Sequence, residues 1–226
     1  MNINFSLERG TGVFFGYSGS GKTQTLRAIT GLMTPDSGII ECNSKTFFDS
    51  EKGINLPVAE RKGALVFQEK NLLPHMTVRE NIQYGMKRRA PLDEKSLNEL
   101  MKKYRLDNID KKYPHEISGG QKQRCAFVRS IAARPDFLCL DEPFSALDNP
   151  VRHNMRKCLG NVIHEMDIPV ILVTHDIHEA LSLADKLFVF MHGEIVQQGT
   201  VKEIIDAPVN DDVRELVYFS HDLKHI

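Results

Sequence analysis

The sequence predicts an α/β fold with a mainly parallel central sheet and helices on both of its faces. Short apolar runs such as Phe137–Leu140 and Val170–Val173 have the length of buried strands. Segments with apolar residues at helical spacing separate these runs, which is the alternation typical of parallel sheets. A chain of 226 residues, 41% of them hydrophobic, is long enough for one domain with a sizeable core.

Strands are predicted where apolar residues alternate or run continuously, and helices where a capping residue precedes apolar residues at helical spacing. Residues 2–7 alternate and predict an edge strand, whereas the polar residues 43–63 predict loops with one short helix. The other expected strands cover residues 12–15, 39–42, 64–67, 137–140, 169–174, 187–191 and 194–198. The other expected helices cover residues 24–31, 118–134 and 147–166, or begin at residues 77, 93, 176 and 200.

A helical insert is expected within a single domain. Thr77 and Glu80 have the spacing of a capping box, and apolar residues at helical spacing follow them. We expect the core of the domain to comprise residues 1–70 and 135–226, and a helical subdomain to occupy about residues 71–134.

Residues Gly16–Thr23 read GYSGSGKT and fit the phosphate-binding pattern G-x-x-x-x-G-K-[ST], between a predicted strand and a predicted helix. Glycines let backbone N–H groups approach anionic oxygens, and the positive end of the helix dipole strengthens their field. Lys22 would reach the β- and γ-phosphates of ATP, and the Thr23 hydroxyl would ligate Mg²⁺. A chance glycine turn is the alternative. The predicted nucleotide contacts are Gly16, Tyr17, Ser18, Gly19, Ser20, Gly21, Lys22, Thr23 and Gln24.

Two adjacent carboxylates follow the predicted strand 137–140. Consecutive residues of a strand point to opposite sides, so Asp141 and Glu142 should have different roles. Asp141 would hold Mg²⁺ through a water molecule, and Glu142 would be the general base that orients and polarises the attacking water. An exposed acidic turn before Pro143 is the alternative.

Gln68 and His175 also end predicted core strands, at the edge where α/β sheets bind their ligands. Gln68 could bind Mg²⁺ or a water, and His175 could hydrogen-bond the γ-phosphate, so both are candidate catalytic residues beside Glu142. Either one could instead be an ordinary loop residue. A metal-binding pair of His175 and His178 would lack a third ligand.

The stretch Ser118–Gln121, with the sequence Ser-Gly-Gly-Gln, begins a predicted helix. Its ends have capping-box spacing, which alone would explain a helix start. Two glycines in the first turn, however, each cost about 1 kcal/mol in helix propensity. Exposure of N–H groups to a second phosphate would explain them. Four residues therefore join the predicted nucleotide contacts: Ser118, Gly119, Gly120 and Gln121.

This set of motifs resembles that of an ABC-type ATPase, the nucleotide-binding subunit of ATP-binding-cassette transporters. The resemblance runs almost from end to end of the chain, in the right order. It implies a homodimer in the ATP-bound state, with two ATP molecules between the Walker A motif of one subunit and the signature of the other. The matching motifs are Walker A (Gly16–Thr23), the Q-loop (Gln68), the signature (Ser118–Gln121, after Ile117 where Leu is more usual), Walker B (Leu138–Glu142), the D-loop (Ser145–Asp148, which adds Asp148 to the nucleotide contacts) and the switch histidine (His175).

The resemblance also implies an importer subunit on the cytoplasmic face of the cell membrane, with transmembrane permease subunits and a solute-binding protein as partners. The stretch Phe48–Pro57, followed by Arg61, is similar to molybdate, tungstate and sulfate importer ATPases. An importer of Fe³⁺, polyamines or another solute is the alternative. An exposed apolar cluster is expected to receive the permease, formed by Leu72, Leu73 and Met76.

Two departures from the family pattern are expected. The family usually carries an adenine-stacking aromatic residue well before Walker A, and this chain begins too late to hold it. Many importer subunits of this type also continue into a C-terminal β-barrel regulatory domain, which we expect to be absent.

Composition and length disfavour other classes. The net charge of −1 gives no field for nucleic acid, which is not an expected partner. No apolar run approaches the roughly 18 residues of a membrane-spanning helix. DNA-repair relatives place a long coiled coil between the P-loop and the signature, and this sequence has no sustained heptads there. Translation-factor relatives carry two cassettes per chain, and this sequence has one. A P-loop kinase has no use for a signature or a switch histidine.

Overall fold

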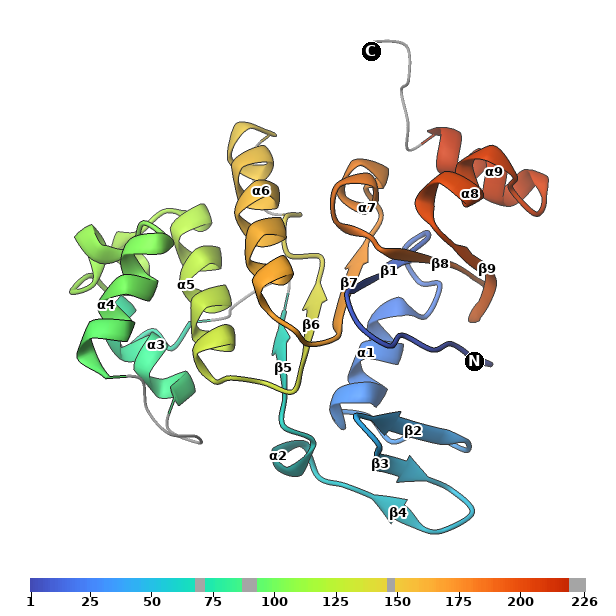
Figure 1. Ribbon diagram of the computed structural model, residues 1–226, viewed down its shortest axis with the longest axis horizontal. Coiled ribbons are helices and arrows are strands. Elements are labelled where there is room, and N and C mark those ends of the chain that lie inside the picture. Colours follow the sequence, from blue (N-terminus) through green and yellow to red (C-terminus); the bar gives the residue numbers. More distant parts are fainter. Residues whose placement is uncertain (68–71, 87–92, 146–148, 220–226) are drawn as a thin grey trace.

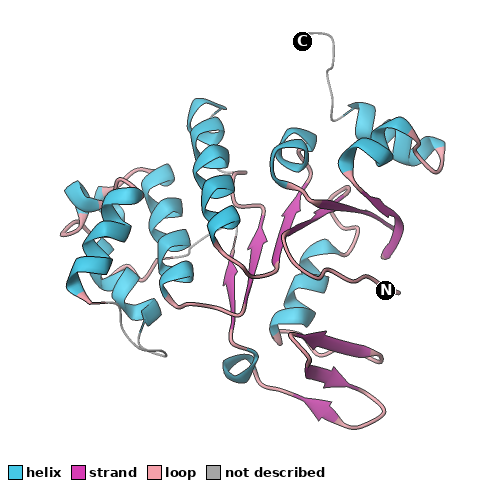
Figure 2. Ribbon diagram, viewed as in Figure 1, coloured by secondary structure: helices cyan, strands magenta, loops and turns pink. Residues whose placement is uncertain are grey.

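The computed structural model describes residues 1–67, 72–86, 93–145 and 149–219. Its centre is a six-stranded sheet in the order β5-β6-β7-β1-β8-β9 (Figure 1; Figure 2). The first five of these strands are parallel, and β9 pairs antiparallel with β8, so the predicted α/β class is confirmed. The strands are β1 (Thr11–Phe15), β5 (Gly63–Val66), β6 (Phe137–Asp141), β7 (Val170–Thr174), β8 (Lys186–Met191) and β9 (Glu194–Gly199).

Alternate residues of the central strands enter two apolar cores, one on each face of the sheet. In β1, Val13 and Phe15 belong to the larger core, whereas Phe14 belongs to the smaller one. Helices α5, α6 and α7 contribute to the larger core, and α1 contributes Leu26 to the smaller. Both faces are thus covered, as continuous apolar strands require. The helices are α1 (Lys22–Thr30), α5 (Gly119–Ala132), α6 (Asn149–Glu165) and α7 (Ile177–Leu183).

A small antiparallel sheet packs on the smaller core and is joined to α1 by one arginine. Arg61 is 1% exposed. Its guanidinium donates hydrogen bonds to the carbonyl oxygens of Ala28 (2.6 Å) and Ile29 (3.0 Å) in the last turn of α1. Its Cζ lies 5.6 Å from the centre of the Phe47 ring. Arg61 therefore satisfies carbonyls that a helix end leaves without partners in the helix. The elements here are β2 (Ile39–Cys42), β3 (Lys45–Asp49), β4 (Ile54–Asn55) and α2 (Val58–Arg61).

Helices α3, α4 and α5 lie together at one end of the molecule, on the side of α6 away from α1 (Figure 1). The predicted capping box begins α3: the Thr77 N–H donates to Glu80 Oε2 at 2.7 Å, and the Glu80 N–H donates to Thr77 Oγ1 at 3.3 Å. Helices α3 and α5 approach so closely that a Cβ at Gly85 would lie 2.3 Å from the carbonyl oxygen of Arg129. The new elements are α3 (Val78–Met86), α4 (Glu94–Lys103) and two 3₁₀ turns, Asp107–Ile109 and Pro114–Glu116.

Three expectations about the fold differ from the structure. Residues 2–7 make a bridge from Asn2 to Glu194 instead of a strand, although their apolar residues do pack on the smaller core. The segment 43–63 holds the expected short helix, α2, but it also holds β3 and β4, where loops were expected. A helix α9 (Asp211–Phe219), which was not predicted, follows α8 (Val201–Asp206). Within the described ranges, the helices are all too short or too polar to cross a membrane.

Candidate nucleotide site

The glycine-rich loop leaves β1 at Gly16 and enters α1 at Lys22. A Cβ at Gly16 (φ 155°) would lie 2.2 Å from the carbonyl oxygen of Phe190 in β8, so the close approach of the two backbones requires glycine. Gly21 (φ 106°) is the N-cap residue of α1 and gives it no side-chain hydrogen bond. The first-turn N–H groups of α1 therefore lack a side-chain cap, which suits the binding of an anion.

Lys22 is buried inside this loop, with 4% of its surface exposed. Its Nζ donates hydrogen bonds to the carbonyl oxygens of Gly16 and Tyr17, both at 2.7 Å. Burial lowers the pKa of Lys22, and the nearby charges of Glu142 and Asp141 oppose that shift. The loop thus places the Lys22 amino group close to the loop N–H groups, where both could contact an anionic ligand.

Thr23 and Asp141 meet where α1 begins and β6 ends. Thr23 Oγ1 donates a hydrogen bond of 2.9 Å to Asp141 Oδ1. Asp141 is 8% exposed, and burial raises its pKa, although the bond from Thr23 opposes the shift. A hydroxyl and a carboxylate side by side are the hard oxygen ligands that Mg²⁺ prefers. The donor set therefore fits the magnesium ion that the motif implies.

Metal binding by protein side chains alone has no support among the described residues. No group of three or more His, Cys, Asp or Glu side chains there could hold a metal ion. A metal pair of His175 and His178 accordingly gains no third ligand from the described part of the chain. Mg²⁺ commonly takes one or two protein ligands and completes its shell with water and phosphate oxygens.

Glu142 and His175 meet next to the Thr23–Asp141 pair. His175 Nδ1 lies 3.3 Å from Glu142 Oε1. Glu142 has a left-handed backbone (φ 45°), a conformation that costs a non-glycine residue about 1–3 kcal/mol and is common at functional sites. Its N–H donates to the carbonyl oxygen of Val173 in β7 at 3.0 Å, and its own carbonyl accepts from Ser145 Oγ at 3.0 Å. The two adjacent carboxylates thus contact different partners: Asp141 contacts Thr23, and Glu142, which lies just beyond the end of β6, contacts His175.

The predicted signature residues lie at the start of α5, away from this cluster. Ser118 N donates to Gln121 Oε1 at 2.8 Å, and Gln121 N donates to Ser118 Oγ at 3.3 Å, which completes the predicted capping box. A Cβ at Gly119 would meet nothing within 4 Å, so packing within the described chain does not demand glycine there. Helix α5 packs on α3 and β5, at the far end of the sheet from the glycine-rich loop (Figure 1). The structure does not bring the signature to the other described site residues.

Two predicted site residues, Gln68 and Asp148, lie outside the described residues. Of the other predicted nucleotide contacts, Tyr17, Ser18, Gly19 and Gln24 are exposed and Ser20 is buried.

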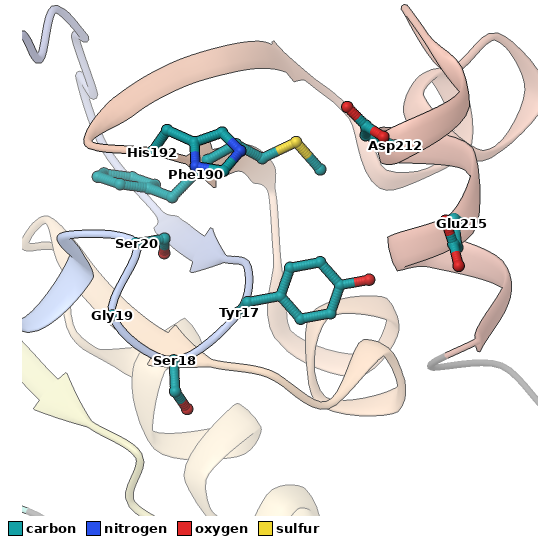
Figure 3. Close-up of a pocket in the computed structure, with 9 residues that line it drawn as sticks. Tyr17, Ser18, Gly19, Ser20, Phe190, His192, Asp212 and Glu215 are labelled. Atoms are coloured by element: carbon teal, nitrogen blue, oxygen red, sulfur yellow. The ribbon is translucent and has the colours of Figure 1, made fainter.

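A hollow beside the glycine-rich loop was not anticipated from the sequence. It has a volume of about 290 Å³ and lies between Tyr17–Ser20, the end of β8 and α9 (Figure 3). The Tyr17 side chain points toward α9, which contributes Asp212 and Glu215 (Figure 3). Lys22, Thr23 and Asp141 do not line the hollow, so it lies beside their cluster and not over it. No short sequence motif marks it because α9 comes from the other end of the chain.

The segment before α3 differs from the expected exposed cluster. Leu72, Leu73 and Met76 are half-buried, and Leu72 packs against the larger core. The cause is Asn81 in α3, which is fully buried. Its Nδ2 donates to the carbonyl oxygens of Leu73 (3.1 Å) and Met76 (3.0 Å), and its Oδ1 accepts from the Leu73 N–H (2.8 Å). Asn81 therefore holds this segment against α3.

Comparison with known proteins gives many similar chains. The chain is 41% identical over 215 residues to the Fe(3+) ions import ATP-binding protein FbpC 2 of Pectobacterium atrosepticum, covering 94% of this chain and 61% of that one. It is 42% identical over 214 residues to the sulfate/thiosulfate import ATP-binding protein CysA 2 of Agrobacterium fabrum, covering 92% and 61%. The chain thus spans about three fifths of the length of these two relatives.

Solved structures agree with this likeness. CbiO1 of Clostridium perfringens, part of the ABC transporter complex CbiONQ, superposes with a TM-score of 0.76 at 27% identity, covering 90% of this chain and 82% of that one. An ATP-binding cassette solved as a dimer in a post-hydrolysis state, bound to ADP and Pi, superposes with a TM-score of 0.73 at 28% identity, covering 88% and 89%. The family model described as ABC transporter matches residues 1–145. Since that match covers more than half of the 226 residues of this chain, the chain belongs to the ABC transporter family.

Proposed function

We propose that the chain is the ATP-binding and ATP-hydrolysing subunit of an importer. The observation that carries this proposal is the convergence of Lys22, the Thr23–Asp141 pair and the Glu142–His175 pair at the carboxyl ends of β1, β6 and β7. A cation inside a glycine-rich loop, two oxygen ligands for magnesium and a carboxylate beside an imidazole are the parts that phosphoryl transfer to water requires.

Hydrolysis assigns a separate task to each carboxylate. Glu142 would accept a proton from a water molecule while the water oxygen attacks the γ-phosphorus, and the bond to the β-phosphate oxygen would break to release ADP. His175 would hydrogen-bond a γ-phosphate oxygen. Thr23 and Asp141, together with Gln68, would hold Mg²⁺, which when bound neutralises charge on the phosphate oxygens.

A second copy of the chain would complete each site. Gly119 lies in open space in the described chain, so its lack of a side chain is better explained by a ligand than by packing. The N–H groups of Gly119 and Gly120, which take no part in the capping box, could bind the phosphate held by the partner's glycine-rich loop. The solved relative that is a dimer with ADP and Pi supports this arrangement. The residues acting across the interface would be Ser118, Gly119, Gly120, Gln121 and Asp148.

The transported solute is proposed to be an oxyanion such as sulfate, molybdate or tungstate. The sulfate/thiosulfate importer subunit of Agrobacterium fabrum, 42% identical, supports this class. Fe³⁺ is the second candidate because the FbpC protein of Yersinia pestis is 44% identical over 197 residues.

The proposed partners are transmembrane permease subunits and a solute-binding protein, with this chain on the cytoplasmic face of the membrane. The names of the relatives as import ATP-binding proteins support a transport complex. The segment from Leu72 to Met76 is the proposed docking surface. Its apolar side chains are half-exposed, and Asn81 gives the segment a defined shape.

The substitution Glu142→Gln tests the proposal. The amide keeps the size of the carboxylate but cannot accept a proton, and loss of a general base commonly slows catalysis about 10²–10⁴-fold. We expect the variant to bind ATP, to lose turnover and to accumulate as an ATP-bound dimer in size-exclusion chromatography. Glu99→Gln, at an exposed position of α4, is the matched control. Near-normal steady-state hydrolysis by Glu142→Gln would reject the assigned role.

A further inference from the structure

The residues on either side of His175 are joined by a hydrogen-bonded chain. The Asp176 N–H donates to Thr174 Oγ1 at 3.0 Å, and Thr174 Oγ1 donates to Glu179 Oε2 at 2.5 Å. A hydroxyl has a single proton, so donation to Glu179 leaves a lone pair of Thr174 directed at the Asp176 N–H. Glu179 thereby determines which way the Thr174 hydroxyl points and closes a bridge across His175.

Helix capping does not explain Glu179. Asp176 caps α7 through its own side chain, which accepts a hydrogen bond from the His178 N–H at 2.8 Å. The Glu179 side chain turns inward instead and is only 3% exposed. Burying a carboxyl group is costly unless it is hydrogen-bonded, and burial raises the pKa of Glu179 to about 7. The hydrogen bond from Thr174 offsets part of the cost of burying this carboxyl, and the nearby charges of Arg152 and Arg156 also favour its ionised form.

The exposed imidazole needs an anchor of this kind. The His175 side chain is 59% exposed, so packing around the ring constrains it little. Its direction depends on the backbone between Thr174 and Asp176, which the bridge fixes. The contact that this backbone sets is the 3.3 Å approach of His175 Nδ1 to Glu142 Oε1.

We propose that Glu179 is a positioning residue, which acts through the Thr174 hydroxyl to aim His175 at Glu142 and at the γ-phosphate. The inference deepens the proposed function and rests on the role given there to His175. The required property of Glu179 is a hydrogen-bond acceptor and not a negative charge. Glutamine at this position should therefore serve, and so should serine in place of Thr174.

Two pairs of substitutions test these requirements. At Glu179 they distinguish the need for a hydrogen-bond acceptor from the need for a charge, and at Thr174 they distinguish the need for a hydroxyl from the need for a side chain of that size. We expect Thr174→Val and Glu179→Met to lower kcat at least about tenfold while KM for ATP changes less than about twofold, because substrate contacts remain. Thr174→Ser and Glu179→Gln should stay within about threefold of the unaltered chain in both constants. Thr30→Val is the matched control: Thr30 is as buried as Thr174, and its hydroxyl bonds the Leu26 carbonyl oxygen in α1, remote from His175.

A second readout does not depend on hydrolysis. In the nucleotide-free 226-residue chain, the Cε1–Hε1 signal of His175 in a ¹³C–¹H spectrum should shift or broaden in Thr174→Val and Glu179→Met, and should stay in place in Thr30→Val. Thr174→Ala replaces Thr174→Val should the latter not give a cooperative thermal transition. An unmoved His175 signal in the hydroxyl-deleting and acceptor-deleting variants would overturn the inference. So would a kcat loss in Glu179→Gln equal to that in Glu179→Met. Absence of hydrolysis in the unaltered chain would reject the proposed function alone, since the His175 signal would still report on positioning.

Discussion

Thr23 Oγ1 donates a hydrogen bond to Asp141 Oδ1 across 118 positions of sequence. The bond connects the first turn of α1 with the end of β6, so the glycine-rich loop and the acidic strand end are in contact. Two oxygen atoms thereby lie side by side, and a rotation of the Thr23 hydroxyl, which keeps its proton, would free its lone pair for a cation.

Asp141→Asn should weaken ATP binding only in the presence of Mg²⁺. The amide keeps an oxygen near Thr23 but removes the charge that favours a divalent cation, which we expect to raise the Kd for MgATP about tenfold or more. Calorimetry with Mg²⁺ and with EDTA measures both affinities. Asp167→Asn, on the surface beside Arg9, is the control. An equal loss of affinity with and without Mg²⁺ would argue against metal binding by Asp141.

Lys22→Ala should lose most nucleotide affinity. Hydrogen bonds to charged groups contribute about 1.5–3 kcal/mol, so losing the ammonium should raise the Kd for ATP about 10- to 100-fold. Because Lys22 also bonds the carbonyls of Gly16 and Tyr17, thermal unfolding of the variant should be measured alongside. Lys52→Ala, at an exposed position in the turn between β3 and β4, should bind ATP normally. Unchanged affinity in Lys22→Ala would contradict the assignment of the loop.

The part of the site that could be predicted from the sequence is the part whose geometry is local or follows from parallel strands. Gly16–Lys22 is one uninterrupted turn between a strand and a helix, and its pattern is written in adjacent residues. Asp141 and His175 are distant in sequence, yet both follow buried strands, and parallel strands bring their carboxyl ends to one edge. The pairing of Asp141 with Val173 in β6 and β7 is that rule in this chain.

Contacts between unrelated segments could not be predicted. Arg61 is among the most buried side chains because the carbonyls of Ala28 and Ile29 receive it, and nothing near Arg61 in sequence indicates those partners. Glu179 has the spacing of a cap after Asp176, but Thr174 of β7 binds its carboxyl instead. The same spacing occurs at Thr77 with Glu80 and at Asp176 with Glu179, and a helix begins at both places. Glu80 caps its helix, whereas Glu179 binds Thr174, so the tertiary neighbour decides which hydrogen bond forms.

Leu73→Asp should prevent assembly with the permease and leave ATP binding intact. Leu73 is half-buried on a segment held by Asn81, so a charge there alters the proposed docking surface without touching the nucleotide site. The measurement is co-purification of membrane proteins with the tagged chain from detergent-solubilised membranes, with ATP affinity measured in parallel. Leu32→Asp, at an exposed leucine after α1, is the control. Undiminished co-purification with Leu73→Asp would remove this surface from the proposal.

Glu179→Gln should make the chain more stable than the unaltered protein at alkaline pH. Burial raises the pKa of Glu179 from its ordinary value of 4.5 to about 7 in the folded chain. Its neutral form therefore contributes stability that is fully present below pH 4.5 and is lost as the pH rises through about 7. The amide does not ionise and retains an acceptor for Thr174.

Urea unfolding at pH 5 and pH 8 measures this difference. One pKa unit corresponds to about 1.4 kcal/mol, so between these two pH values the free energy of unfolding should fall by about 2 kcal/mol more in the unaltered chain than in Glu179→Gln. Other titrating groups are common to both proteins and cancel in the comparison. Identical pH dependence of the two proteins would mean that Glu179 is ionised in the folded chain throughout this range, and that a charged carboxylate binds the Thr174 hydroxyl.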